Sequence, residues 1–146
     1  MTSTTPLSAG AGSQARTDHR LTAAAAGLVA FALTAYFTWQ GANSDGEIVS
    51  MLALEAVVAL VLFGWLVPTR AVTGAPATAL TLGIIATLLV LPAFWSGLPL
   101  LLGVAGVMIG RASRGKRAVA GGALGALASV VYLYLYVVVD MIQGKL

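Results

Sequence analysis

Five apolar stretches separated by short polar gaps make up most of the chain. They are residues 21–39, 48–67, 75–91, 94–110 and 118–139. Each comes near the roughly 20 residues that a helix rising about 1.5 Å per residue needs to cross about 30 Å of hydrocarbon. The pattern therefore predicts an all-α, integral membrane helical bundle of five transmembrane helices within residues 21–142.

Basic residues fall in every second gap. With five spans and a cytoplasmic N-terminus, only Lys145 of the eight lysine and arginine residues lies outside, as the positive-inside rule requires. The others are Arg16, Arg20, Arg70, Arg111, Arg114, Lys116 and Arg117. A four-span alternative, with residues 75–110 as one helix, puts the last four outside and splits the eight evenly. Charge therefore favours five spans with an outside C-terminus and makes Arg111, Arg114, Lys116 and Arg117 topology-determining.

Prolines support the same division. Pro92 and Pro99 flank a short segment, and proline ends one helix and can begin the next. We expect a tight outer turn over residues 92–98, and we expect Pro68 to end the second helix and Pro76 to begin the third. A fourth helix that starts only at Leu98 would cover about 20 Å by Gly110, so it would need shielding by neighbouring helices.

Composition agrees with a membrane environment. Hydrophobic residues make up 59% of the chain, charged residues 9%, and the mean hydropathy is +0.94, whereas about a quarter of the residues in soluble domains are charged. The first twenty residues are small and polar, with Pro6 and no apolar periodicity, and are predicted to form a disordered cytoplasmic tail. The rival interpretation, a cleaved signal peptide, is disfavoured because the first stretch ends in bulky Tyr36, Phe37 and Trp39.

The sequence contains few residues of the types that enzymes use for catalysis. The chain has no cysteine and one histidine, His19. It contains no metal-ligand spacing, no nucleophile elbow and no phosphate loop. We therefore expect no enzymatic activity, no cofactor and no metal. The basic turn could meet acidic lipid headgroups or RNA, but its role in orientation explains it, and no nucleic-acid partner is expected.

Glu55 is the only charged residue within the five stretches. It lies about 12 Å from the outer end of its helix, marked by Glu47, so we expect the carboxyl group to be protonated and hydrogen-bonded at neutral pH. Thr34 and Tyr132 lie at a similar predicted depth and can hydrogen-bond a carboxyl group. Glu55, Thr34 and Tyr132 form the candidate buried polar site, which serves either as a proton or cation relay or as a buried hydrogen-bonded strut.

Small residues mark the expected helix contacts. Gly106 and Gly110 in the fourth stretch, and Gly121 and Gly125 in the fifth, stand four apart on one helical face, and Ala118, Gly122 and Ala126 repeat this spacing beside them. Such spacing lets membrane helices approach closely. We expect a close antiparallel hairpin of the last two helices, while the spacing leaves open whether each face is internal or lies between subunits.

The last third of the chain carries a resemblance. The run Val-Met-Ile-Gly-Arg-Ala, a basic turn and then Arg-Ala-Val-Ala-Gly-Gly-Ala-Leu-Gly resembles the glycine-rich helical hairpin of small bacterial membrane domains of unknown function, often found in actinobacteria. The resemblance implies a multi-pass protein of the bacterial inner (plasma) membrane and supplies no activity.

Three function classes follow from these patterns. We expect a non-enzymatic structural or interaction subunit that acts through helix–helix association, surrounded by the lipid bilayer and contacting a second copy or other membrane proteins. The alternative is a small transporter or ion-conducting oligomer that uses Glu55. A lipid-modifying enzyme would need a polar catalytic group at headgroup level, which the sequence does not offer.

Overall fold

The computed structural model describes residues 9–41 and 44–144, and all regular elements in this part of the chain are helical. They are α1 (Ala9–Gly41), α2 (Asp45–Ala59), η1 (Leu60–Leu66), α3 (Val67–Thr73), α4 (Pro76–Leu89), η2 (Phe94–Ser96), α5 (Leu98–Ala112) and α6 (Lys116–Ile142). The segments α2, η1 and α3 follow one another without a break. The all-α prediction is confirmed.

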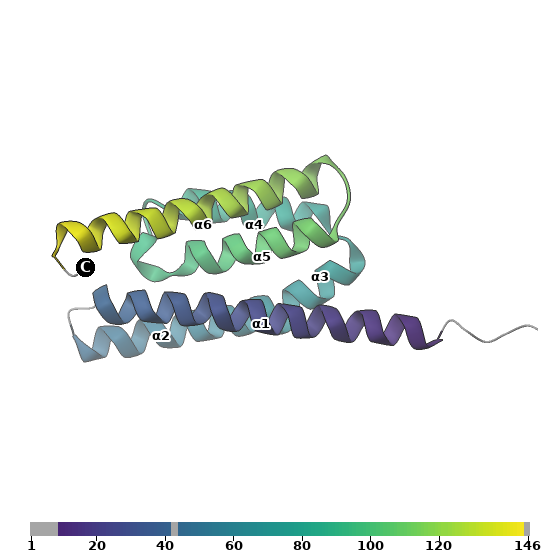
Figure 1. Ribbon diagram of the computed structural model, residues 1–146, viewed down its shortest axis with the longest axis horizontal. Coiled ribbons are helices and arrows are strands. Elements are labelled where there is room, and N and C mark those ends of the chain that lie inside the picture. The colour runs from purple at the N-terminus through teal and green to yellow at the C-terminus, as the bar shows by residue number, and fades with distance from the viewer. Residues whose placement is uncertain (1–8, 42–43, 145–146) are drawn as a thin grey trace, which may run out of the picture.

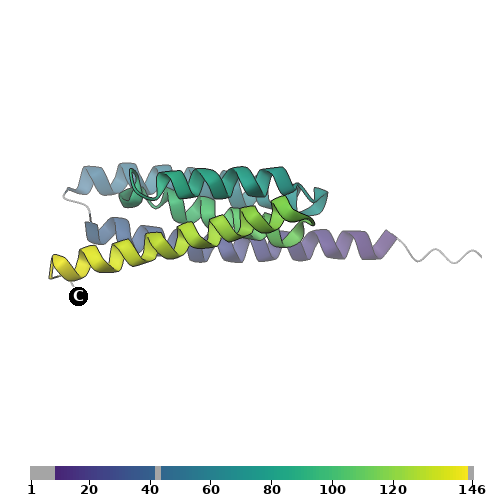
Figure 2. The ribbon, with the colours of Figure 1, turned by 90° about the horizontal axis from the view of Figure 1, so that it is seen from above.

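The helices lie side by side in two layers around a central one. Helices α1 and α2 form one layer, α4 and α6 form the other, and α5 runs between them, as the two views in Figures 1 and 2 show together. Helix α5 contacts α1, α2, α3, α4 and α6. It carries eight buried residues although it is only 15 residues long, so this short helix is well covered by protein.

Three helical stretches are long and apolar enough to cross a membrane, namely Thr17–Gln40, Asp45–Thr73 and Lys116–Ile142. Helices α4 and α5 are apolar but shorter, and their 14 and 15 residues cover about 21 and 22 Å. The predicted division of residues 75–110 into two helices is confirmed. The predicted start of the fourth helix at residue 94 was too early, because residues 94–96 form the short 3₁₀ helix η2 and α5 begins at Leu98.

Pro68 does not end the second helix, contrary to expectation. The helix continues to Thr73 and ends at Gly74, whose φ of 61° gives a left-handed cap. The segment before Pro68 is π-helical, with the N–H group of Val67 bonded to the carbonyl group of Leu62, five residues back. A π-helical turn rearranges the carbonyl groups that a proline ring would otherwise meet, so the chain passes the proline without breaking.

The N-terminal segment also differs from expectation. Helix α1 already begins at Ala9, so residues 9–20 are helical rather than part of a disordered tail; residues 1–8 and Lys145 lie outside the described residues. The segment after Pro6 is rich in alanine and lacks further proline. Extending an existing helix avoids a second nucleation step, so the membrane helix can continue toward the N-terminus.

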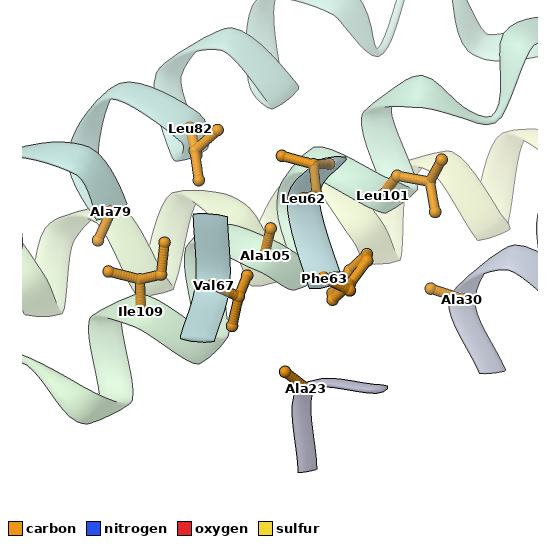
Figure 3. Packing of buried hydrophobic residues seen from close by; sticks show 10 residues of the cluster. All are labelled: Ala23, Ala30, Leu62, Phe63, Val67, Ala79, Leu82, Leu101, Ala105 and Ile109. Atoms are coloured by element: carbon orange, nitrogen blue, oxygen red, sulfur yellow. The ribbon is translucent and has the colours of Figure 1, made fainter. Parts of the chain in front are cut away.

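The apolar core joins the two layers near the middle of the bundle. Figure 3 shows ten buried side chains drawn from four α-helices and η1. Ala23 and Ala30 come from α1, Leu62 and Phe63 from η1, Val67 from α3, Ala79 and Leu82 from α4, and Leu101, Ala105 and Ile109 from α5. Many large apolar side chains on the outside remain exposed, such as Leu60, Leu88 and Val130, and a bilayer would cover them.

Glycine lets the backbones of α4, α5 and α6 meet within the molecule. A Cβ atom on Gly125 would lie 2.5 Å from the carbonyl O of Gly103, and one on Gly110 would lie 2.8 Å from that of Ala118, so both glycines face the α5–α6 contact. Gly121 instead packs against the backbone of Ala79 in α4. Gly106 also faces α4, where a Cβ atom would lie 3.5 Å from the Ala79 carbonyl O.

Two glycines at these contacts were not predicted. A Cβ atom on Gly83 of α4 would lie 2.5 Å from the carbonyl O of Gly121, and one on Gly103 would lie 2.6 Å from the carbonyl O of Gly125. Gly122 differs from its neighbours, since a Cβ atom there would have only the Cα atom of Gly110 within 4 Å, at 3.9 Å. The helix faces that carry Gly110, Gly121 and Gly125 therefore pack within the molecule and do not lie between subunits.

The basic residues of the turn after α5 are exposed, as are those of α3. Arg111, Arg114, Lys116 and Arg117 surround the connection between α5 and α6, and this connection and α3 lie at the same end of the bundle (Figure 1). The start of α2, with Asp45 and Glu47 in its first turn, lies at the opposite end (Figure 1). The basic side chains at the α5–α6 connection and the acidic side chains in the first turn of α2 thus lie at opposite ends of the bundle.

Replacing Gly121 by alanine should destabilise the fold, whereas the same change at Gly122 should not. A methyl group at Gly121 would overlap the backbone of Ala79 and Leu80, while one at Gly122 has room. Overpacking typically costs about 1–3 kcal/mol. Thermal unfolding of the two purified variants in detergent checks this, and equal unfolding temperatures would contradict the close α4–α6 contact.

Candidate functional site

Glu55 lies in the interior of the bundle, with none of its side chain exposed. It is on α2, and its Oε1 atom accepts a hydrogen bond of 2.6 Å from the Oγ1 atom of Thr38 on α1. This bond links two helices through groups that are both buried. A carboxyl group surrounded by apolar side chains needs such a donor, because leaving a buried polar atom unpaired costs about 1–3 kcal/mol.

Thr34 lies beside the carboxyl group but gives its own hydrogen bond elsewhere. Its side chain is fully buried next to Glu55, and its hydroxyl group donates to the carbonyl O of Phe31 in the same helix at 3.0 Å. The structure therefore brings together the predicted pair of Glu55 and Thr34. It assigns the interhelical bond to Thr38, one turn closer to the end of α1, which sequence reasoning did not select.

The direction of side chains on a helix explains why Thr38 is the partner. Side chains tilt toward the N-terminus of their own helix, and α2 begins at Asp45, at the end of the bundle where α1 finishes. The long side chain of Glu55 therefore reaches toward that end, past the level of its own Cα atom. An estimate from Cα depth alone selects Thr34, whereas adding this tilt would have selected Thr38.

Gly97, in the turn before α5, also lies against the Glu55 carboxyl group. It precedes α5 with a φ of 66°, a left-handed conformation that glycine adopts readily. A Cβ atom there would lie 2.6 Å from the Cβ atom of Thr34 and 2.7 Å from Oε1 of Glu55. The turn between η2 and α5 thus packs its bare backbone onto the Glu55–Thr34 pair, and only glycine fits that position.

Tyr132 is also fully buried. Its ring meets Phe37 of α1 edge-on, with centroids 6.2 Å apart, and Tyr136 one turn later, with centroids 5.6 Å apart. Tyr136 donates a hydrogen bond of 2.8 Å to the carbonyl O of Phe37. Both tyrosines lie within electrostatic range of Glu55, so α6 closes the same polar region against α1.

Two buried polar atoms in this region have no hydrogen-bond partner among the described residues. They are Oε2 of Glu55 and the hydroxyl oxygen of Tyr132. Most buried polar atoms in folded proteins are paired, so each such atom calls for a reason. A protonated carboxyl group can donate through Oε2, and a tyrosine hydroxyl group can both donate and accept, so both groups retain unused hydrogen-bonding capacity.

The described residues contain no group of three or more histidine, cysteine, aspartate or glutamate side chains that could hold a metal ion. The groups around the Glu55 carboxyl are the hydroxyl groups of Thr38 and Thr34 and the backbone of Gly97. Oxygen is thus the ligand atom that the side chains of these neighbours offer, which suits hydrogen bonding, proton binding or a cation that prefers oxygen.

No protein-family profile matches the chain, and no curated protein or solved structure is detectably similar to it. The resemblance of the last third to glycine-rich bacterial membrane hairpins therefore stays a prediction.

Replacing Thr38 by valine should destabilise the protein by about 1–3 kcal/mol, since it removes the donor to a fully buried carboxyl oxygen. Thr38→Ser keeps the hydroxyl group and should lose much less. Thr34→Val should also lose less, because Thr34 donates within its own helix. Unfolding of the three variants in detergent gives the comparison, and a Thr38→Val protein as stable as Thr38→Ser would show that this bond contributes little.

Proposed function

We propose that this chain is a multi-pass membrane protein whose five main helices all cross the bilayer, with the N-terminus in the cytoplasm and the C-terminus outside. Three of the helical stretches have the length and composition for it. The two short helices lie against longer neighbours, and α5 is largely enclosed, which supports a full crossing despite its length. The basic turn between α5 and α6 marks the cytoplasmic end.

The bacterial inner membrane is the proposed location. It rests on the resemblance of the last third of the chain to bacterial membrane hairpins, and the high share of apolar residues on the outside of the bundle is compatible with it.

Within that membrane, we propose a non-enzymatic role in association with another transmembrane helix. The observation that carries this proposal is a row of exposed alanines on the outward face of α6, namely Ala120, Ala123 and Ala126. The opposite face, with Gly121 and Gly125, is covered by α4 and α5. Small residues on a membrane-facing surface allow a second helix to approach closely, which is how membrane helices gain contact where lipid gives no hydrophobic drive.

Ala123→Leu should weaken this association. Adding methylene groups to a closely packed contact costs about 1–3 kcal/mol, which corresponds to about 5- to 150-fold in an association constant. Ala25→Leu on the exposed side of α1 is the matched control. Crosslinking of the full-length chain in vesicles at several protein-to-lipid ratios measures the effect. Equal crosslinking of both variants and the unmodified chain would show that this face of α6 is not the interface.

A second candidate function is a proton or cation relay, which the unpartnered Oε2 atom of Glu55 and the unpartnered hydroxyl group of Tyr132 favour. The two groups come from α2 and α6, on opposite sides of the bundle (Figure 1). Asp140, a further acidic residue, is buried near the end of α6, one turn beyond Tyr136.

Glu55→Gln separates the two functions. The amide keeps an oxygen that accepts from Thr38 but no longer titrates, so association should survive and proton movement should stop. The test is proton uptake into vesicles under an imposed potential, with a pH-sensitive dye inside. Equal uptake by the unmodified chain and by Glu55→Gln would exclude the relay.

A further inference from the structure

A groove runs between α1 and the α2–η1 helix on the side of the bundle. It has a volume of about 460 Å³ and is lined by apolar residues. Ala24, Gly27 and Phe31 contribute from α1, and Ala56, Leu60 and Gly64 from α2 and η1. Both walls are helices that run along the bundle axis (Figure 1), so the groove runs in the direction that a lipid chain takes in a bilayer.

A second cavity of about 230 Å³ adjoins the groove, and Gly64 lines both. This cavity is bounded by Arg20 of α1 and by Trp65, Pro68, Thr69 and Thr73. Among the described residues that line the two cavities, Arg20, which is exposed, is the one that carries a charge, and none is acidic. Trp65 is 66% exposed, as tryptophan often is at the boundary between lipid and water.

The two cavities form one surface on α1. Arg20, Ala24, Gly27 and Phe31 are spaced by four, three and four residues, so they follow one face of the helix. The face is positive at the end near the predicted cytoplasmic side and apolar for about 16 Å beyond Arg20, at about 1.5 Å per residue. The surface is therefore amphipathic along the membrane normal.

Gly64 keeps this surface open. A Cβ atom there would find nothing within 4 Å, so no internal contact requires glycine at this position, whereas glycine inside a helix is unfavourable by roughly 0.5–1 kcal/mol relative to alanine. Gly27 across the groove is different, since Phe63 packs directly on it, with a Cβ atom there 2.6 Å from the Cβ atom of Phe63. Gly64 also lies in the π-helical segment, a feature that often marks functional positions.

We propose that this surface binds one anionic phospholipid of the cytoplasmic leaflet, with an acyl chain in the groove and the phosphate group at Arg20. The charge of Arg20 complements a phosphate group, and no acidic side chain among the described residues lines the cavity beside it. Basic pockets between membrane helices on the cytoplasmic side suit acidic headgroups. The apolar groove complements the chain. A partner helix would leave the charged cavity unused, and a free phosphate ion would leave the apolar groove unused, so a lipid fits both parts.

Native mass spectrometry of the full-length protein tests this site, with phosphatidylglycerol and phosphatidylcholine of identical acyl chains as probes. The unmodified protein should bind one phosphatidylglycerol molecule in preference to phosphatidylcholine. Arg20→Gln should lower that preference by about fivefold, the contribution of one basic residue near a membrane surface. Arg114→Gln, which removes a charge from the α5–α6 connection, should change it much less.

The groove is tested by a matched pair on α1. Ala24 lines the groove, whereas the neighbouring Ala25 is exposed outside it. Ala24→Leu should reduce binding of both lipids, and Ala25→Leu should not. Gly64→Leu is a second variant for the same purpose, because its added side chain starts in open space. Circular dichroism and gel filtration identify any variant that does not fold, and only folded variants are compared.

Four results would overturn the proposal: an unchanged lipid preference in Arg20→Gln, an equal loss in Arg114→Gln, equal lipid binding by the folded Ala24→Leu and Ala25→Leu proteins, or a change of oligomeric state in Ala24→Leu without a change in lipid binding. The last result would place a second copy of the chain in the groove. The site is independent of the association proposed for α6, so Ala123→Leu should bind lipid as the unmodified protein does.

Discussion

Direct contact between the backbones of α5 and α6 is the constraint on which the rest of this bundle depends. Gly103 and Gly125 face each other so closely that a Cβ atom on either would lie 2.5–2.6 Å from the carbonyl O of the other. Gly83 and Gly121 bring α4 to α6 in the same way. Because three backbones meet without side chains between them, the short helix α5 can lie at the centre, and its neighbours take the place of the lipid that it is too short to match.

The position of α5 in turn determines the environment of Glu55. The turn before α5 carries Gly97 onto the carboxyl group, while Thr38 reaches it from α1. The α1–α2 hairpin is thus fastened to the glycine-packed helices by a polar contact at the turn before α5 and by the apolar cluster that includes Phe63 and Leu101. The groove beside Gly64 follows the same pair of α1 and η1, where Phe63 packs on Gly27. The same packing therefore accounts for one buried polar region and one open apolar surface.

Apolar length, charge and proline spacing were enough to predict the helices and the break between α4 and α5, because these depend on local chemistry. Three features depended on information that local patterns lack. Pro68 was expected to end its helix, but the π-helical turn before it lets the helix continue, and the sequence pattern did not reveal that turn. Thr38 was missed because depth was counted at Cα atoms, without the tilt of the Glu55 side chain. Gly83 and Gly103 were missed because a single glycine in a helix marks a close contact only where the backbone of another helix faces it, and the sequence does not show which backbone does. Gly97, directly before a Leu-Pro helix start, did carry a local signal for a left-handed turn.

The remaining inferences rest on the proposed five-crossing arrangement, which would place the Arg20 cavity at the cytoplasmic leaflet and Glu55 between the two surfaces. A reporter fused after residue 146 tests it most directly, by comparing an enzyme active only outside the membrane with one active only in the cytoplasm. Five crossings from a cytoplasmic N-terminus require activity of the outside reporter and none of the inside one. Activity of the inside reporter would mean an even number of crossings, with α4 and α5 failing to span separately, and would contradict the proposed topology.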